Sequence, residues 1–136
     1  MLACGIVFSI TAVQLACAAD VTVRVTGVHN DRGQIFASLC QRGEYLRSQC
    51  EHSARTAAHS GTVLLTFADV QPGNYAIQVF HDENSDGQLN RNSRGIPVEG
   101  YGFSNNATGA MGPPVFSDAE IDVDSKARVF MIEMKY

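Results

Sequence analysis

Residues 62–81 read TVLLTFADVQPGNYAIQVFH and carry the clearest structural pattern of the chain. Apolar side chains occupy every second position on both sides of the segment 69–73, which is the period of a β-strand with one buried face. The inward positions are Val63, Leu65 and Phe67 before that segment and Tyr75, Ile77 and Val79 after it. The pattern predicts two strands, 62–68 and 74–81, joined as a hairpin.

The turn between these strands contains Pro72, Gly73 and, two positions later, Tyr75. In immunoglobulin-like and transthyretin-like sandwiches a tyrosine at such a corner hydrogen-bonds back to the loop before it. We therefore expect Tyr75 to bond back to its own turn.

Alternation of the same period extends toward the N-terminus. One strand begins at Val21 and ends at Gly27 or Val28, and a second covers 34–40. The turn residues 30–33 lie between them, so these two strands are also predicted to form a hairpin. The expected inward positions are Val21, Val23, Val25, Ile35, Ala37 and Leu39.

The remaining segments complete an all-β pattern. Residues 41–61 are polar and predict a long loop with a short helical turn near 54–58, and 82–114 form a second long, Gly- and Asn-rich loop. Strands are expected at 119–123 and 127–136, the latter central because both of its faces are apolar. The fold prediction is a Greek-key β-sandwich, immunoglobulin-like or transthyretin-like, of about seven strands.

Composition limits the function classes. The chain has 136 residues, 45% hydrophobic and 18% charged, with a net charge of -4. This length predicts one domain and is too short for a barrel enzyme of roughly 250 residues. Only ten lysines and arginines are present, with no basic run, which argues against a nucleic-acid partner.

The N-terminus predicts export. An apolar run from Leu2 to Val13 precedes the small residues Ala16-Cys17-Ala18, which is typical of a signal peptide, although no basic residue precedes the run. We expect a signal peptide over 1–19, cut after Ala18 or Ala19, and a single domain over 20–136 that is periplasmic or secreted. The alternative is a buried N-terminal strand or helix. No other stretch is long and apolar enough to predict a membrane span.

Two cysteines, Cys40 and Cys50, lie after the predicted signal peptide. An even pair in an oxidising compartment predicts a disulfide. The alternative is a zinc site that adds His52 and His59, but this spacing matches no zinc template.

Residues 82–90 read DENSDGQLN and resemble the first half of a calcium-binding loop. Side-chain oxygens at positions 1, 3 and 5 can face one centre, while glycine at position 6 permits the tight turn. The predicted calcium ligands are Asp82, Asn84, Asp86, Gln88 through its carbonyl, and Asn90. The glutamate expected at position 12 is replaced by Ser93, so Glu99 is the candidate to complete the shell. The alternative is a solvated turn without metal.

The block from 80 to 116 carries a family resemblance. It contains FHDEN at 80–84, GIP at 95–97, EGYGFSNNA at 99–107 and GPP at 112–114. With these motifs the chain resembles the bacterial domain of unknown function 2141. The resemblance implies an exported β-sandwich and offers no catalytic residues. The loop is also similar to the calcium loops of surface-protein B-type repeats, which favours metal binding at Asp82, Asn84 and Asp86.

The segment 99–107 is unusual for a plain connection. Its aromatic and amide side chains could form a platform for a sugar, so Glu99, Tyr101, Phe103 and Asn105 are candidate ligand-binding residues. The alternative is packing: Tyr101 and Phe103 would cap the sandwich while the amides bond neighbouring backbone. The sequence favours packing but leaves both open.

Catalysis has little support. Ser104 lacks the second glycine of a nucleophile elbow, and His81 is expected to brace the loop or bond a carbonyl rather than form a dyad with Asp82. The leading hypothesis is a non-enzymatic exported module that presents residues 82–114 to an unknown protein or glycan partner. The alternatives are an accessory subunit of an envelope assembly, for which Phe116 and 127–136 are the candidate contacts, and a small metal-dependent hydrolase using His81 and Glu99.

Overall fold

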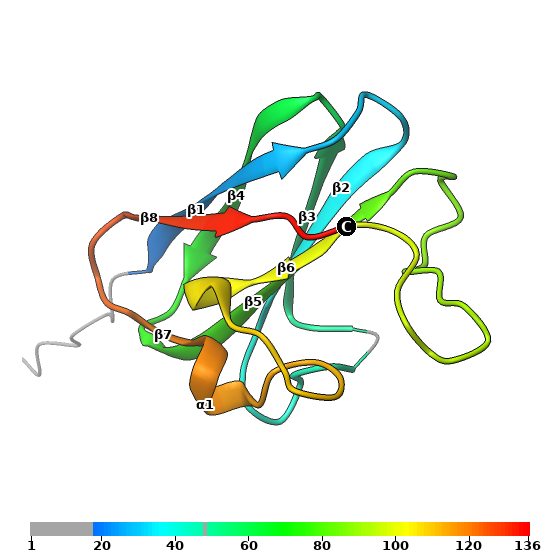
Figure 1. Cartoon of the computed structure of the whole chain (residues 1–136). Helices are drawn as coiled ribbons and strands as arrows, with labels where there is room; N and C mark the ends of the chain where they lie inside the picture. The colour runs from blue at the N-terminus through cyan, green and yellow to red at the C-terminus, as the bar shows by residue number, and fades with distance from the viewer. Residues whose placement is uncertain (1–17, 48) are drawn as a thin grey trace, which may run out of the picture.

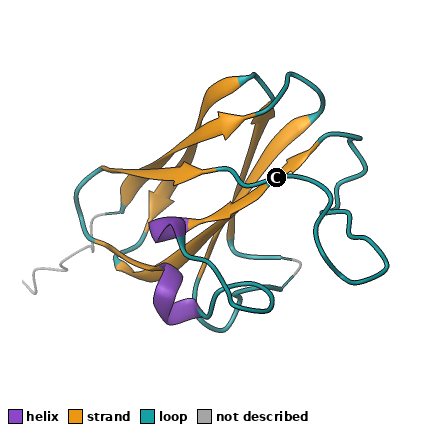
Figure 2. Cartoon of the chain, in the orientation of Figure 1, coloured by secondary structure: helices purple, strands orange, loops and turns teal. Residues whose placement is uncertain are grey.

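Two β-sheets face each other and form the body of the protein (Figures 1 and 2). The computed structural model describes residues 18–47 and 49–136. The prediction of an all-β sandwich is confirmed, with eight strands where the sequence predicted about seven. Most of the predicted signal peptide, 1–19, lies outside the described residues. Among the described residues, no helix has the length and apolar character required to cross a membrane.

The smaller sheet has three strands in the order β4-β1-β8. The larger one has the order β3-β2-β5-β6, with β7 also paired to β5. The strands are β1 (Ala19–Val28), β2 (Gln34–Cys40), β3 (His52–Ala57), β4 (Gly61–Val70), β5 (Gly73–Asp82), β6 (Tyr101–Phe103), β7 (Glu120–Val123) and β8 (Arg128–Glu133). Two short helices, η1 (Ser104–Asn106) and α1 (Phe116–Ala119), lie between β6 and β7.

The core lies between the two sheets and consists of the predicted alternating positions. All twelve predicted inward side chains of β1, β2, β4 and β5 are buried in one cluster, joined by Ile121, Val123 and Ile132. The predicted tyrosine corner is also confirmed, because the Tyr75 hydroxyl donates to the carbonyl of Gln71 at 2.7 Å. The hydrophobic period thus predicted correctly which face of each strand is buried.

The two predicted hairpins are wrong. β1 pairs with β4 and β8, while β2 pairs with β3 and β5, so both short turns carry the chain from one sheet to the other. The prediction that 41–61 is a loop with a helical turn is wrong as well, since β3 runs antiparallel to β2 there. β3 is a polar edge strand with no fully buried residue, so it lacks the apolar alternation by which strands are recognised.

The last strand is also different from its prediction. β8 is an edge strand paired parallel to β1, not a central one. Its Ile132 is fully buried, but Val129 and Met131 are 66% and 60% exposed. Apolar residues on both faces therefore did not mean burial on both faces.

A disulfide closes the long connection between β2 and β3. Cys40 and Cys50 are bonded, as predicted, with their Cα atoms 5.2 Å apart. Cys40 is fully buried at the end of β2, so the bridge anchors the polar segment 41–51 to the core. The zinc alternative is excluded because both thiols are consumed.

One edge of β5 is shared by two short strands. β7 pairs with 73–76 and β6 with 78–80, which leaves Ile77 between them. Ser104, itself 1% exposed, fills this position: its hydroxyl oxygen accepts from the N–H of Ile77 at 2.9 Å, and its hydroxyl donates to the carbonyl of Ala119. The serine thus continues the sheet across the gap.

Candidate metal centre

The calcium-like loop begins at the last residue of β5. The carboxylate of Asp82 accepts from the backbone N–H groups of Asp86 at 3.1 Å and Gly87 at 2.8 Å. Further along, the Asp86 carboxylate accepts from the N–H of Gln88 at 2.9 Å. Gly87 adopts a positive φ of 78°, as expected for the tight turn. These bonds fold the loop back over the end of the sheet and keep its acidic side chains together.

Glu99 reaches the same place from the other end of the loop. A backbone bond from Val98 N–H to the carbonyl of Asn90, 2.9 Å long, draws the returning segment alongside the outgoing one. The Glu99 carboxylate accepts from the N–H groups of Glu83 at 3.2 Å and Asn90 at 3.1 Å. The glutamate therefore fastens both ends of the loop.

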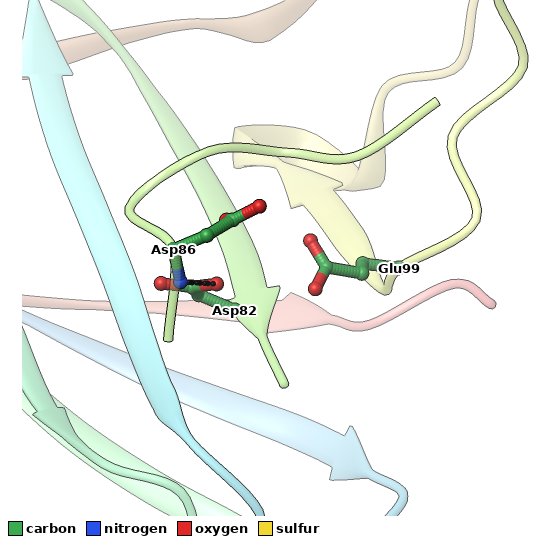
Figure 3. A group of neighbouring side chains, drawn as sticks. All are labelled: Asp82, Asp86 and Glu99. Carbon is green, nitrogen blue, oxygen red and sulfur yellow. Dashed lines mark hydrogen bonds between the residues drawn. The ribbon is translucent and has the colours of Figure 1, made fainter. Parts of the chain in front are cut away.

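Three carboxylates converge at this point (Figure 3). One oxygen each from Asp82, Asp86 and Glu99 lies within 4.8 Å of the other two. Asp82 is 1% and Glu99 7% exposed, whereas Asp86 is on the surface. The structure thus gives the incomplete calcium-like motif the additional carboxylate that the sequence required.

The electrostatics of the cluster favour a cation. Within the described residues none of the three carboxylates forms an ion pair, and the nearby Arg32 pairs with Glu83 instead, at 2.8 Å. Even at the upper limit of 4.8 Å, two such charges repel by about 3.5 kcal/mol at an effective dielectric constant of about 20. The pKa of Asp86 is lowered, chiefly by the amide of Asn90 and then by the backbone of Gln88, so its charge persists at neutral pH.

The two predicted amide ligands contact the cluster through Asp86. Asn84 and Asn90 donate side-chain N–H bonds to the same Asp86 oxygen, at 3.2 and 2.8 Å. Gln88 contributes its backbone N–H to Asp86. An ion at this centre would require both amides to turn their oxygens inward, which a change of the side-chain torsion supplies. The donor set is then all oxygen, the chemistry that Ca²⁺ prefers.

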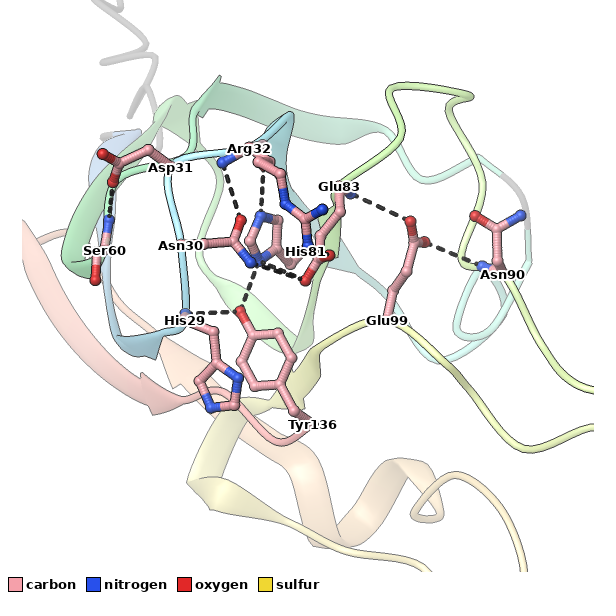
Figure 4. A network of polar contacts seen from close by, with 10 residues as sticks. All are labelled: His29, Asn30, Asp31, Arg32, Ser60, His81, Glu83, Asn90, Glu99 and Tyr136. Atoms are coloured by element: carbon pink, nitrogen blue, oxygen red, sulfur yellow. Dashed lines mark hydrogen bonds and ion pairs between the residues drawn. The ribbon is translucent and has the colours of Figure 1, made fainter.

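A buried histidine supports the base of the loop (Figure 4). His81 is fully buried; its Nε2 lies 2.6 Å from the carbonyl oxygen of Arg32 and its Nδ1 2.6 Å from the hydroxyl of Tyr136. Because a carbonyl can only accept, Nε2 donates to Arg32, and in the neutral ring Nδ1 then accepts from the tyrosine hydroxyl. Both ring nitrogens are therefore engaged, as expected for a bracing histidine.

The candidate ligand-binding residues of the segment 99–107 do not form one site. Asn105 donates to the carbonyls of Asp118 at 3.2 Å and Glu120 at 2.9 Å, which fixes η1 to α1 and β7. Phe103 is 8% exposed and packs in a small second core with Phe116, while Tyr101 is half-buried beside them. Of the four candidates, Glu99 therefore joins the metal cluster and Tyr101 keeps an accessible face.

Comparison with known proteins identifies the family. A family model described as "Uncharacterized protein conserved in bacteria (DUF2141)" matches residues 23–130. The chain belongs to DUF2141. The match begins within β1 and ends halfway along β8, so the predicted resemblance is confirmed across most of the sandwich and the whole candidate metal centre.

Other comparisons add little about the DUF2141 domain. No curated protein matches it significantly. Among solved structures it is similar to a pilus-presented adhesin, Spy0125 (Cpa), with 16% identity and a TM-score of 0.35. That match covers 89% of this chain and 27% of the adhesin chain. A likeness this weak gives no information on ligand or partner.

Proposed function

We propose that this protein is an exported, non-enzymatic calcium-binding module that presents its Gly- and Asn-rich loop region, 82–114, to a partner. The observation that carries the proposal is the convergence of two buried carboxylates, Asp82 and Glu99, with Asp86, none of them in an ion pair among the described residues. Buried charges are stable when they are paired or coordinate a metal. Oxygen ligands with side-chain spacing 1, 3 and 5 favour calcium over the strictly octahedral magnesium.

Calcium would fix the presented region. Its ligands come from both ends of the loop, Asp82 at the start and Glu99 at the end, so one ion would bridge the outgoing and returning segments. The part of this region between β5 and β6, 83–100, projects beyond the sheets at one end of the sandwich (Figure 1), which leaves it accessible to another molecule. The expected affinity is weak, with a Kd of about 10⁻⁴ to 10⁻³ M, as in extracellular modules.

The test is calcium titration by calorimetry, with thermal melting before and after chelation. We expect saturable heat and a rise in Tm, because calcium at ten times its Kd, about 1–10 mM, stabilises the native state by about 1.4 kcal/mol. Asp86→Ala should abolish both effects. Asp124→Ala is the matched control, because Asp124 is an exposed carboxylate paired with Arg128 away from the loop. The absence of heat up to several millimolar calcium would refute the metal site.

Export is supported by two features, the signal-like N-terminus and the Cys40–Cys50 disulfide. Disulfides persist in oxidising compartments such as the periplasm and the cell exterior. Expression of the full chain in a bacterial host, with fractionation and N-terminal sequencing, tests this part of the proposal. The expected product begins at Ala19 or Asp20, outside the cytoplasm. A cytoplasmic product with its N-terminus intact would contradict export.

The non-enzymatic part rests on how the candidate catalytic side chains are engaged. Ser104 is buried and bonded to backbone on two sides, and both ring nitrogens of His81 have partners. Neither side chain can reach a substrate without breaking these bonds. If the calcium-loaded protein hydrolysed ester or phosphoester substrates, and Asp86→Ala lacked that activity, the hydrolase alternative would replace this proposal.

One observation favours the second candidate, an accessory subunit of an envelope assembly. Leu64, Val129 and Met131 are 60–66% exposed on the outer face of the three-stranded sheet. The other predicted contact, Phe116, is buried under Arg42 instead. Cross-linking in the native host, with and without Met131→Lys, tests this candidate. A cross-linked partner lost in the variant would support it.

A further inference from the structure

A long cleft lies beside the calcium-like loop. It consists of two adjoining hollows of about 500 Å³ and 480 Å³, neither of them enclosed. The floor of the first hollow is formed by β2, β5 and β6 and that of the second by β6, and the walls are the segments 87–97 and 109–113. The two hollows share Leu89, Arg91, Tyr101, Phe103 and Pro113. Each has the volume of an ordinary ligand site, and the two are joined through the five residues they share.

The cleft is positively charged although the protein is acidic. Arg47, Arg91 and Arg94 line it, three of the ten lysines and arginines of the chain, and no acidic side chain does. None of these arginines forms an ion pair within the described residues. Clefts lined by one sign of charge attract ligands of the opposite sign. The cleft is therefore complementary to an anion.

The same cleft exposes large aliphatic side chains. Leu46 is 50%, Ile96 54% and Met111 fully exposed, and each comes from a different segment of the chain. Exposed apolar side chains that gather around a groove mark a binding surface. The occupant must therefore carry apolar groups of its own.

The floor of the cleft holds an unpaired acceptor. The side-chain oxygen of Gln78 is buried and has no hydrogen-bond partner, and it is the one such side-chain atom found among the described residues. A buried polar atom without a partner destabilises the state that leaves it unpaired. If the Gln78 side chain turns toward the cleft, a ligand N–H or O–H group pairs with this oxygen and removes this cost.

The positive charge, the exposed aliphatic side chains and the unpaired acceptor together select a ligand class. A fatty acid or simple aromatic anion satisfies the charge and the apolar surface but has no donor for Gln78. An acidic glycan satisfies the charge and the acceptor but has no aliphatic side chains. An extended peptide with acidic and aliphatic side chains satisfies all three, because its backbone supplies N–H groups. We infer that the cleft binds an extended acidic peptide segment of a protein partner.

The inference deepens the proposed function and rests on it in one respect, that the loop region is the presented surface. Gly87, Gln88, Leu89 and Arg91, which follow Asp86 directly, form part of the cleft wall. An ion held by Asp86 would order this wall and tighten peptide binding. The cleft itself does not require the ion, so the two proposals can fail separately.

The test is selection of a phage-displayed library of random ten-residue peptides on the immobilised full chain, in 5 mM calcium and, separately, in EDTA. We expect enrichment of peptides that combine Asp or Glu with Leu, Ile or Val. A fluorescein-labelled peptide from the enriched set then gives affinities by anisotropy. Arg47→Glu/Arg91→Glu should weaken its binding at least about tenfold, because the charge is reversed at both hollows. Arg24→Glu, the same change on the other sheet, should not.

A second variant tests the floor of the cleft. Gln78→Leu removes an acceptor that is unpaired in the free protein, so its thermal stability should not fall, whereas peptide affinity should drop by about two- to tenfold. No enrichment, or binding that survives the double arginine variant, would overturn the inference. Arginine-dependent binding of polygalacturonate without peptide enrichment would assign the cleft to an acidic glycan instead. Calcium heat without peptide binding refutes only this inference, and peptide binding without calcium heat refutes only the metal site.

Discussion

Replacing Ser104 by alanine should destabilise the protein strongly, although the change removes one atom. The hydroxyl accepts from the N–H of Ile77 and donates to the carbonyl of Ala119, both at a buried position between β6 and β7. In Ser104→Ala the Ile77 N–H loses its partner, which costs about 1–3 kcal/mol, and the lost bond to Ala119 adds about 1 kcal/mol. The expected loss is about 2–4 kcal/mol, a large share of the 5–15 kcal/mol typical of a domain.

Urea unfolding followed by circular dichroism measures this loss. The midpoint should fall while the m-value stays constant, because the surface exposed on unfolding does not change. Hydrogen exchange by NMR should show faster exchange of the Ile77 amide than in the wild type. The control is Ser117→Ala, an exposed serine of α1, which should change stability by less than about 0.5 kcal/mol. If Ser104→Ala were as mild as this control, Ser104 would not be the residue that joins the two short strands.

Three further predictions concern other parts of the molecule. Cys40→Ala/Cys50→Ala should lower the free energy of unfolding, measured by urea unfolding, by about 3 kcal/mol, because the disulfide closes a connection with a sequence separation of 10. Equal stability of the variant and the wild type would contradict this. Burial, with a smaller contribution from Asp118, raises the pKa of Tyr45 to about 12. The stability that the protonated Tyr45 hydroxyl contributes is therefore complete below pH 10 and is lost as pH rises through 12. Tyr45→Phe should remove the highest-pH component of the alkaline absorbance titration. Gly33→Ala places a Cβ 1.9 Å from the Asp82 carbonyl oxygen at a residue whose φ is 70°, so it should both destabilise the fold and reduce the heat of calcium binding. The control is Gly61→Ala, where φ is 99° and no atom lies within 4 Å of the added Cβ. It should cost only the backbone strain of about 1–2 kcal/mol and leave the heat of calcium binding unchanged.

The strands of the core could be predicted because their physics is local. A buried face imposes a period of two on neighbouring residues, and that period located the inward side chains of β1, β2, β4 and β5. It contains no information on which strand pairs with which. Short turns suggested hairpins, yet here they connect opposite sheets. β3 was missed for a different reason: an edge strand with polar faces has no apolar period to detect.

The candidate site was also predictable only in its local part. The spacing of Asp82, Asn84 and Asp86 is local, so the motif could be read directly. Glu99 was a candidate from its acidic side chain, but only the folded loop shows that it meets Asp82 and Asp86. The cleft could not be predicted, because Leu46, Arg91 and Met111 come from three segments whose proximity depends on the tertiary fold.

The parallel pairing of β8 with β1 affects how this domain folds. The first and last strands of the described chain are hydrogen-bonded neighbours, so the smaller sheet stays incomplete until residues 128–133 are available. Such pairings between the two ends of a sequence have high contact order, which slows folding. During that delay one side of β1 has free backbone donors and acceptors that can pair with another chain. Newly made molecules are therefore most prone to aggregate before their last strand has docked, and a chain truncated after β7 would keep that liability permanently.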